Sequence, residues 1–230
     1  MKRYRWLLGC CLFLSIGMLW AADEPDLRML QQKAAQSRDM EGYVGVCKYL
    51  YQTEENPELL LLYADSIHQL ATKSKKPEQL VEYYIWASEG NFIKGDFQQG
   101  YALKRKAIAL AEKAGLKFAI SQSCCDMGYY CNVDARYDSA RYYFRKGLEA
   151  GEDLSEAGEA CRTMLTNYAS SFLFEGKTDS ALVYTIRASE RSAADKDTAM
   201  LIENLNQLGT IYRRKKDLEN CIANFEQALH

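Results

Sequence analysis

The stretch that decides the fold is NQLGTIYRRKKDLENCIANFEQAL, residues Asn206–Leu229, because its plan occurs repeatedly in the chain. Four turn blocks recur at intervals of about 40 residues: Gly95-Asp96-Phe97, Ala135-Arg136-Tyr137, Gly176-Lys177-Thr178 and Lys216-Asp217-Leu218. Five residues after each block begins stands a small residue, namely Gly100, Ala140, Ala181 and Cys221. Seven residues further comes another: Ala107, Gly147, Ala188 and Ala228. One unit returning at a fixed period of this size is typical of a stacked solenoid.

The segments between these turns read as helices throughout. Proline is confined to positions 25, 57 and 77, and the last two stand where helices are expected to begin. No long alternation of β-branched residues indicates a strand. The predicted helices are 26–37, 40–53, 57–73, 77–93, 97–114, 117–133, 137–150, 155–174, 178–193, 197–214 and 218–229. Short turns join them into antiparallel pairs, so the predicted class is all-α.

The last three units align position by position. Their matching residues are Met127-Gly128, Cys131, Ala140, Phe144 and Gly147; then Tyr168-Ala169, Phe172, Ala181, Thr185 and Ala188; then Leu208-Gly209, Tyr212, Cys221, Phe225 and Ala228. A small residue on one helix leaves a hole for a large side chain of its partner, which allows close helix packing. Replacing Ala181 by Leu should therefore overpack the contact, at a cost of about 1–3 kcal/mol.

This alternation of large and small residues resembles the tetratricopeptide repeat. The period of about 40 residues exceeds the usual 34 of that family and is similar to its long-repeat subclass, seen in kinesin light chains and exported bacterial regulators. Leu165-Thr166-Asn167-Tyr168-Ala169 and Leu205-Asn206-Gln207-Leu208-Gly209 resemble that subclass's core motif. The resemblance implies a right-handed α-solenoid of antiparallel helix hairpins. It divides the chain into degenerate repeats over 23–76 and tandem repeats over 77–116, 117–154, 155–196 and 197–230.

The N-terminal segment 1–22 reads as a cleaved secretory signal peptide. Lys2, Arg3 and Arg5 precede an uncharged apolar run, Trp6–Trp20, and Ala21-Ala22 supply a cleavage site. The run is shorter than the roughly 20 residues that span a bilayer. We therefore expect a periplasmic or secreted protein. An uncleaved membrane anchor is the alternative, and Leu7-Leu8-Gly9-Cys10 leaves lipidation as a less favoured one.

Charge and cysteine usage narrow the class further. Cleavage would remove three basic residues and change the net charge from −2 to −5, with both signs interspersed, so this segment offers no basic face for nucleic acid. The cysteines left after cleavage are Cys47, Cys124, Cys125, Cys131, Cys161 and Cys221. An exported protein can pair such thiols into disulfides. Several stand where the repeat requires a small apolar residue, which favours free core thiols.

No catalytic, metal or cofactor motif is present. The sequence has no phosphate-binding glycine loop and no G-x-S-x-G elbow. Apart from the terminal His230, His68 is the only histidine, too few for a zinc site with these cysteines. We interpret His68 as a solvent-facing or hydrogen-bonded residue. The chain is therefore predicted to be no enzyme, to bind no metal and to carry no cofactor.

A binding role follows from the resemblance, because in that family the first helices of successive repeats line a concave groove. The positions implied are Gln122, Asp126, Tyr129, Asn132, Thr163, Thr166, Asn167, Ser170, Glu203, Asn206, Thr210 and Arg213, with Trp86 and Glu89 extending the surface. Amide side chains such as Asn167 and Asn206 suit a peptide backbone, since each donates and accepts hydrogen bonds. The basic cluster that clamps a C-terminal carboxylate in some members is not evident. The expected ligand is a peptide or a protein partner.

An alternative function comes from the end of the sequence. Phe225-Glu226-Gln227-Ala228-Leu229-His230 stops inside a second helix without the polar cap that solenoids usually carry. We therefore expect the natural protein to continue. On this interpretation the chain is the exported sensor portion of a longer membrane signalling or transcription-regulatory protein, and the repeats sense a ligand or form a homo-oligomer. Membrane contact would then come only from the N-terminal segment or from that continuation.

Overall fold

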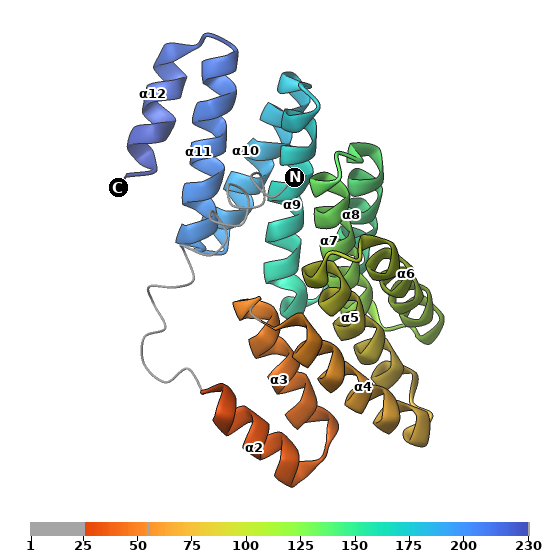
Figure 1. Ribbon diagram of the computed structural model, residues 1–230. Helices are drawn as coiled ribbons and strands as arrows, with labels where there is room; N and C mark the ends of the chain where they lie inside the picture. The colour runs from red at the N-terminus through yellow and green to blue at the C-terminus, as the bar shows by residue number, and fades with distance from the viewer. Residues whose placement is uncertain (1–25, 55, 230) are drawn as a thin grey trace. The chain divides into compact units, whose positions relative to one another are not determined.

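The computed structural model describes residues 26–54 and 56–229, and the predicted signal peptide lies outside them. Over these residues eleven α-helices and one 3₁₀ turn follow one another, with no strand (Figure 1). They are α2 (Leu27–Ser37), α3 (Met40–Thr53), α4 (Pro57–Ser74), α5 (Pro77–Lys94), α6 (Phe97–Ala114), α7 (Lys117–Val133), α8 (Tyr137–Gly151), η1 (Ser155–Ala157), α9 (Gly158–Phe174), α10 (Thr178–Ala194), α11 (Thr198–Arg214) and α12 (Leu218–Gln227). The predicted ranges agree within two residues, except that the helix expected to start at 155 begins with η1.

Local sequence signals account for where the helices begin and end. The side chains of Asp96, Asp197 and Asp217 each accept a hydrogen bond from a backbone N–H in the first turn of the following helix, which satisfies a donor that the helix leaves open. Gly95 takes a left-handed conformation, φ 93°, after α5, where a side chain would be strained.

The described residues form two compact units. The N-terminal unit contains the residues up to Tyr130 together with Tyr142–Cys161, and the C-terminal unit contains Cys131–Arg141 together with the residues from Arg162 onward. In the N-terminal unit each of α2 to α5 packs on the helix that follows it in the chain, as Figure 1 shows. Side chains such as Val46, Leu60, Ile67 and Val81 build a continuous apolar core between these helices.

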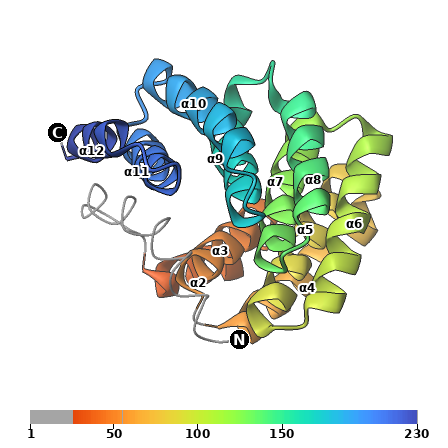
Figure 2. The same ribbon diagram turned by 90° about the horizontal axis from the view of Figure 1, so that it is seen from above.

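In the C-terminal unit α11 packs against both α10 and α12, and Figures 1 and 2 show it between them. A smaller apolar core of Leu173, Ala181 and Ile211 joins α9, α10 and α11. Neighbouring helices thus bury their apolar faces pairwise, and the predicted all-α solenoid of helix hairpins is confirmed. In the part of the chain that the structure describes, no helix is long and apolar enough to cross a bilayer.

The close approach expected from the small residues is present in both units. A Cβ atom added to Gly128 would lie 2.3 Å from Cε1 of Phe144, and one added to Gly209 would lie 2.8 Å from the ring of Phe225. The phenylalanine follows the glycine by the same number of positions in both pairs, so each pair joins the two helices of one hairpin in the same way. Each ring fills the space that a missing side chain leaves open.

Candidate functional site

The residues predicted to line the groove differ widely in exposure. Gln122, Asn206 and Arg213 are exposed, and Asp126, Tyr129, Thr163, Asn167, Glu203 and Thr210 are partly exposed. Trp86, Glu89, Asn132, Thr166 and Ser170 are buried. All of them were expected on a surface, but these five side chains are buried inside their units.

In the N-terminal unit, Glu89 belongs to a buried ionic cluster. The ammonium group of Lys104 on α6 donates to the carboxylate of Glu89 on α5, and its Nζ atom also lies 2.9 Å from Oδ2 of Asp126 on α7. The hydroxyl of Tyr130 donates to the other oxygen of Glu89, at 2.8 Å. Lys104 and Glu89 are shielded from solvent, whereas Asp126 keeps part of its side chain exposed. The cluster ties three consecutive helices together with two carboxylates around one ammonium group.

Burial sets the electrostatics of this cluster. Burial raises the pKa of the Glu89 carboxyl above its usual value, and the neighbouring Lys104 ammonium only partly opposes that rise. Burial alone would lower the pKa of Lys104, but the carboxylates of Asp126 and Glu89 raise it above its ordinary value. Lys104 therefore stays charged, and the cluster is held by charge-assisted hydrogen bonds.

Lys104 occupies a repeat position that holds an aromatic ring in two other hairpins. Phe144 stands one repeat period after Lys104, and Phe225 has the same place in the last hairpin. The signal that distinguishes Lys104 from an ordinary surface lysine is its place four residues after Gly100, since Phe144 and Phe225 follow Ala140 and Cys221 by the same distance. A charge at a core position explains why two acidic side chains converge on it.

In the C-terminal unit, the buried hydroxyls of α9 bind side chains of α11. Thr166 Oγ1 donates to Oδ1 of Asn204 at 2.9 Å, and Nε2 of Gln207 donates to Ser170 Oγ at 2.6 Å. Gln207 also accepts a hydrogen bond from Thr185 Oγ1 on α10, at 3.0 Å. Thr166 and Ser170 are thus occupied in holding α11 and face no open groove within this unit.

The side chain of Asn132 is engaged in a similar way. Its Nδ2 atom donates to the backbone carbonyl of Asn167 at 3.0 Å, so the contact uses the main chain of Asn167 and not its side-chain amide. Asn204 and Gln207 were not among the predicted residues, although each forms a polar contact between hairpins. Spacing is a signal for Gln207, because it follows Thr185 by 22 residues just as Asp126 follows Lys104 by 22.

One predicted set remains open on the surface of α11. Asn206, Thr210 and Arg213 are spaced by four and three residues, so they share one face of the helix, and Glu203 extends that face by a further turn. Within residues 26–54 and 56–229, none of the side chains of Asn206, Thr210 and Arg213 takes part in a hydrogen bond or ion pair. We call these three residues the α11 stripe.

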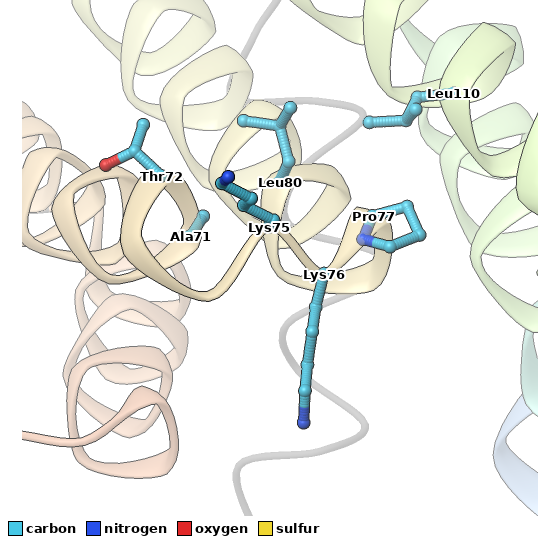
Figure 3. Close-up of a pocket in the computed structure, with 7 residues that line it drawn as sticks. All are labelled: Ala71, Thr72, Lys75, Lys76, Pro77, Leu80 and Leu110. Atoms are coloured by element: carbon cyan, nitrogen blue, oxygen red, sulfur yellow. The ribbon is translucent and has the colours of Figure 1, made fainter.

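A separate hollow of about 310 Å³ lies in the N-terminal unit beside the turn between α4 and α5. It is lined by Ala71, Thr72, Lys75, Lys76, Pro77, Leu80 and Leu110. Figure 3 shows the extended side chain of Lys76 directed away from the two leucines. The lining is largely apolar and includes none of the predicted groove residues, so the hollow brings no reactive groups together.

His68 and the cysteines, the residues that could act as nucleophiles or metal ligands, are packed against neighbouring side chains. The ring of His68 stacks on Tyr83, with the ring centroids 4.3 Å apart. All six cysteines of the described residues are buried, and Cys47, Cys124, Cys125 and Cys221 are free thiols. Burial raises the pKa of Cys47 and of Cys124 to about 12, which keeps both protonated and unreactive. Over the described ranges, no group of three His, Cys, Asp or Glu side chains could hold a metal ion.

Comparisons with known proteins identify the fold. No family model matches the sequence, and no curated protein matches it. Among solved structures, the chain is similar to BtubC (BKLC) from P. vanneervenii, with a TM-score of 0.70 and 14% sequence identity over 88% of this chain and 85% of BtubC. At this identity the similarity shows a shared helical-repeat fold and nothing about function.

Proposed function

We propose that this chain is an exported, non-enzymatic protein-binding module built from long tetratricopeptide-type repeats. The packing supports the repeat type, since Gly128 with Phe144 and Gly209 with Phe225 place a small residue against a ring at matching positions of two hairpins. The 22-residue spacing of the polar contacts between hairpins supports it as well.

The α11 stripe is the observation that carries the binding role. Thr166 and Ser170 on α9 stand one repeat period before Asn206 and Thr210, and they use their hydroxyls to hold the helix that packs over them. At the same positions Thr210 presents a hydroxyl and Asn206 presents an amide, and both side chains are accessible. A surface that binds a protein segment in one repeat is therefore displayed in the next. Interaction, with no chemical conversion, is the function that this arrangement fits.

The test is cross-linking of the intact protein in envelope extract followed by mass spectrometry of the linked peptides. We expect partner cross-links near α11 that an Asn206→Ala/Arg213→Ala variant loses. A Gln98→Ala/Arg105→Ala variant, which changes exposed residues of α6, should retain them. If both variants keep the same partners with the same link positions, the α11 stripe is not the binding surface.

Export is a separate part of the proposal. It is supported by the basic residues before Trp6–Trp20 and by the small residues at Ala21-Ala22. The protein recovered from fractionated cells should then lie outside the cytoplasm, and N-terminal sequencing should show that it begins at Asp23. Recovery of chains that still start at Met1 would contradict cleavage.

A further inference from the structure

The hollow beside the α4–α5 turn combines an apolar lining with a local excess of positive charge (Figure 3). Residues 71–77, which form this turn, contain three lysines and no acidic residue. Lys75 and Lys76 belong to the lining, and neither forms an ion pair in the part of the chain that the structure describes. The volume of about 310 Å³ is at the lower limit of the roughly 300–1,000 Å³ found for small-molecule sites, so the hollow suits one inserted side chain better than a larger ligand.

The opposite charge gathers on the α8–α9 turn of the same unit. Residues 147–161 contain five acidic residues and no lysine or arginine. Glu152, Asp153 and Glu156 are exposed, and none of them forms an ion pair within residues 26–54 and 56–229. Leu154 stands between them, is partly exposed and has an extended backbone, with φ −104° and ψ 118°. The turn therefore presents one apolar side chain flanked by carboxylates, which is the complement of an apolar hollow flanked by lysines.

Both features lie along one edge of the N-terminal unit. Consecutive antiparallel helices place every second turn at the same end, so the α4–α5, α6–α7 and α8–α9 turns share an end. Contacts agree with this placement. Nζ of Lys146 on α8 lies 2.8 Å from Oε1 of Glu112, which follows the hollow-lining Leu110 by two residues on α6. A Cβ atom added to Gly151 at the end of α8 would lie 2.4 Å from Oγ of Ser121 in the first half of α7.

The acidic turn does not cover the hollow of its own molecule. Over the described ranges, no ion pair joins Lys75 or Lys76 to Glu152, Asp153 or Glu156. An anionic membrane surface would attract the lysines but would be repelled by the acidic turn on the same edge, and like charges set opposite each other are unfavourable. A second copy of the chain meets both signs of charge at once, because it carries the same basic and acidic elements.

We infer that two copies of this chain associate through this edge, with the α8–α9 turn of each copy seated on the hollow of the other. A two-fold axis brings a surface onto its own copy, so the basic and acidic elements satisfy each other twice. Leu154 of one copy enters the hollow of the other. The carboxylates of Glu152 and Asp153 face the ammonium groups of Lys75 and Lys76. This association goes beyond the proposed function and uses a different part of the chain from the α11 stripe.

The test is sedimentation equilibrium of the purified intact protein and two charge-reversed variants. The wild type should be a dimer. Lys75→Glu/Lys76→Glu and Glu152→Lys/Asp153→Lys should each raise the dimer dissociation constant about tenfold or more, because like charges then face each other. An equimolar mixture of the two variants should dimerise again, since each reversed element meets an opposite charge on the other variant. Restored association in the mixture also shows that both variants are folded.

Three further measurements separate this contact from general charge effects. Lys48→Glu/Arg105→Glu makes the same change of net charge at exposed positions of α3 and α6 and should leave the dissociation constant unchanged. Leu154→Ser should weaken the dimer without changing its charge. Raising the salt concentration from about 0.1 M to about 1 M shortens the screening length from about 10 Å to about 3 Å, so it should also weaken the dimer.

Three results would overturn the inference: a wild-type protein that is monomeric at every concentration, a mixture of the two charge-reversed variants that stays monomeric, or equal weakening by Lys48→Glu/Arg105→Glu. A monomeric wild type that binds vesicles of anionic phospholipid through Lys75 and Lys76 would show that a lipid surface occupies the hollow, and the inference of a second copy would be wrong. Each of these failures leaves the proposed function standing, because the cross-linking test of that function concerns α11.

Discussion

The Nζ atom of Lys104 lies 2.9 Å from Oδ2 of Asp126 while the same ammonium group donates to Glu89, so one cation holds two carboxylates inside the N-terminal unit. Removing the cation should leave both anions without a counter-charge. We expect Lys104→Met to lower the free energy of unfolding by about 3–5 kcal/mol, measured by urea denaturation.

The matched control neutralises the whole cluster. Lys104→Met/Glu89→Gln/Asp126→Asn has no buried charge to compensate, and it should recover most of the stability that the single variant loses. A single Lys104→Met variant within about 1 kcal/mol of the wild type would show that the cluster does not hold α5, α6 and α7 together.

The space around a glycine predicts opposite outcomes for replacing Gly128 and Gly45 by alanine. Gly128→Ala places a Cβ atom 2.3 Å from Phe144, and we expect it to cost about 1–3 kcal/mol. Gly45→Ala, inside α3 with nothing within 4 Å of the added atom, should stabilise the protein by about 0.5–1 kcal/mol. Thermal unfolding of both variants measures the difference. In a double-mutant cycle with Phe144→Leu, the cost of Gly128→Ala should shrink, and full additivity would mean that the ring is not the obstacle.

Glu203 on α11 gives a pH-dependent prediction. Burial raises the pKa of its carboxyl above the usual value of about 4.3. Folding favours the protonated form of Glu203. The protonated carboxyl therefore contributes fully to the free energy of unfolding below the unfolded pKa, and this contribution is lost as pH rises through the folded pKa. Glu203→Gln stays neutral, so it should be more stable than the wild type at pH 7 and equal to it at pH 4. Equal melting temperatures at both pH values would contradict the assigned burial.

The thiols of Cys47 and Cys124 should resist alkylation in the folded protein. Their pKa values of about 12 leave almost no thiolate at pH 8, and the thiolate is the reacting form. Mass spectrometry after iodoacetamide treatment should find both residues unmodified in native protein and modified in urea. Ala109→Cys, at an exposed position of α6, supplies a thiol that should react in both conditions. Native modification of Cys47 as fast as that of the introduced cysteine would contradict the burial.

The helices could be predicted from the sequence because their signals are local. Pro57, Asp96 and Gly95 mark ends, and the repeat period fixes which helices pair. The site was harder, because polar residues such as Thr166 and Asn206 look alike in sequence. One is covered by Asn204 and the other is exposed, and that difference depends on a helix more than thirty residues away. Lys104 was overlooked for a related reason, since its two counter-charges come from α5 and α7.

A polar contact between residues 22 positions apart joins neighbouring hairpins in two places, and it also affects which hairpins can stand next to each other. Apolar contacts carry no hydrogen-bonding pattern, so they distinguish one neighbouring hairpin from another less sharply than polar contacts do. The Lys104 ammonium donates to the carboxylate of Asp126, whereas the Thr185 hydroxyl donates to the amide oxygen of Gln207. Exchanging two hairpins would place the Lys104 ammonium opposite an amide, which does not neutralise its charge. A changed order of hairpins would therefore lower the free energy of unfolding.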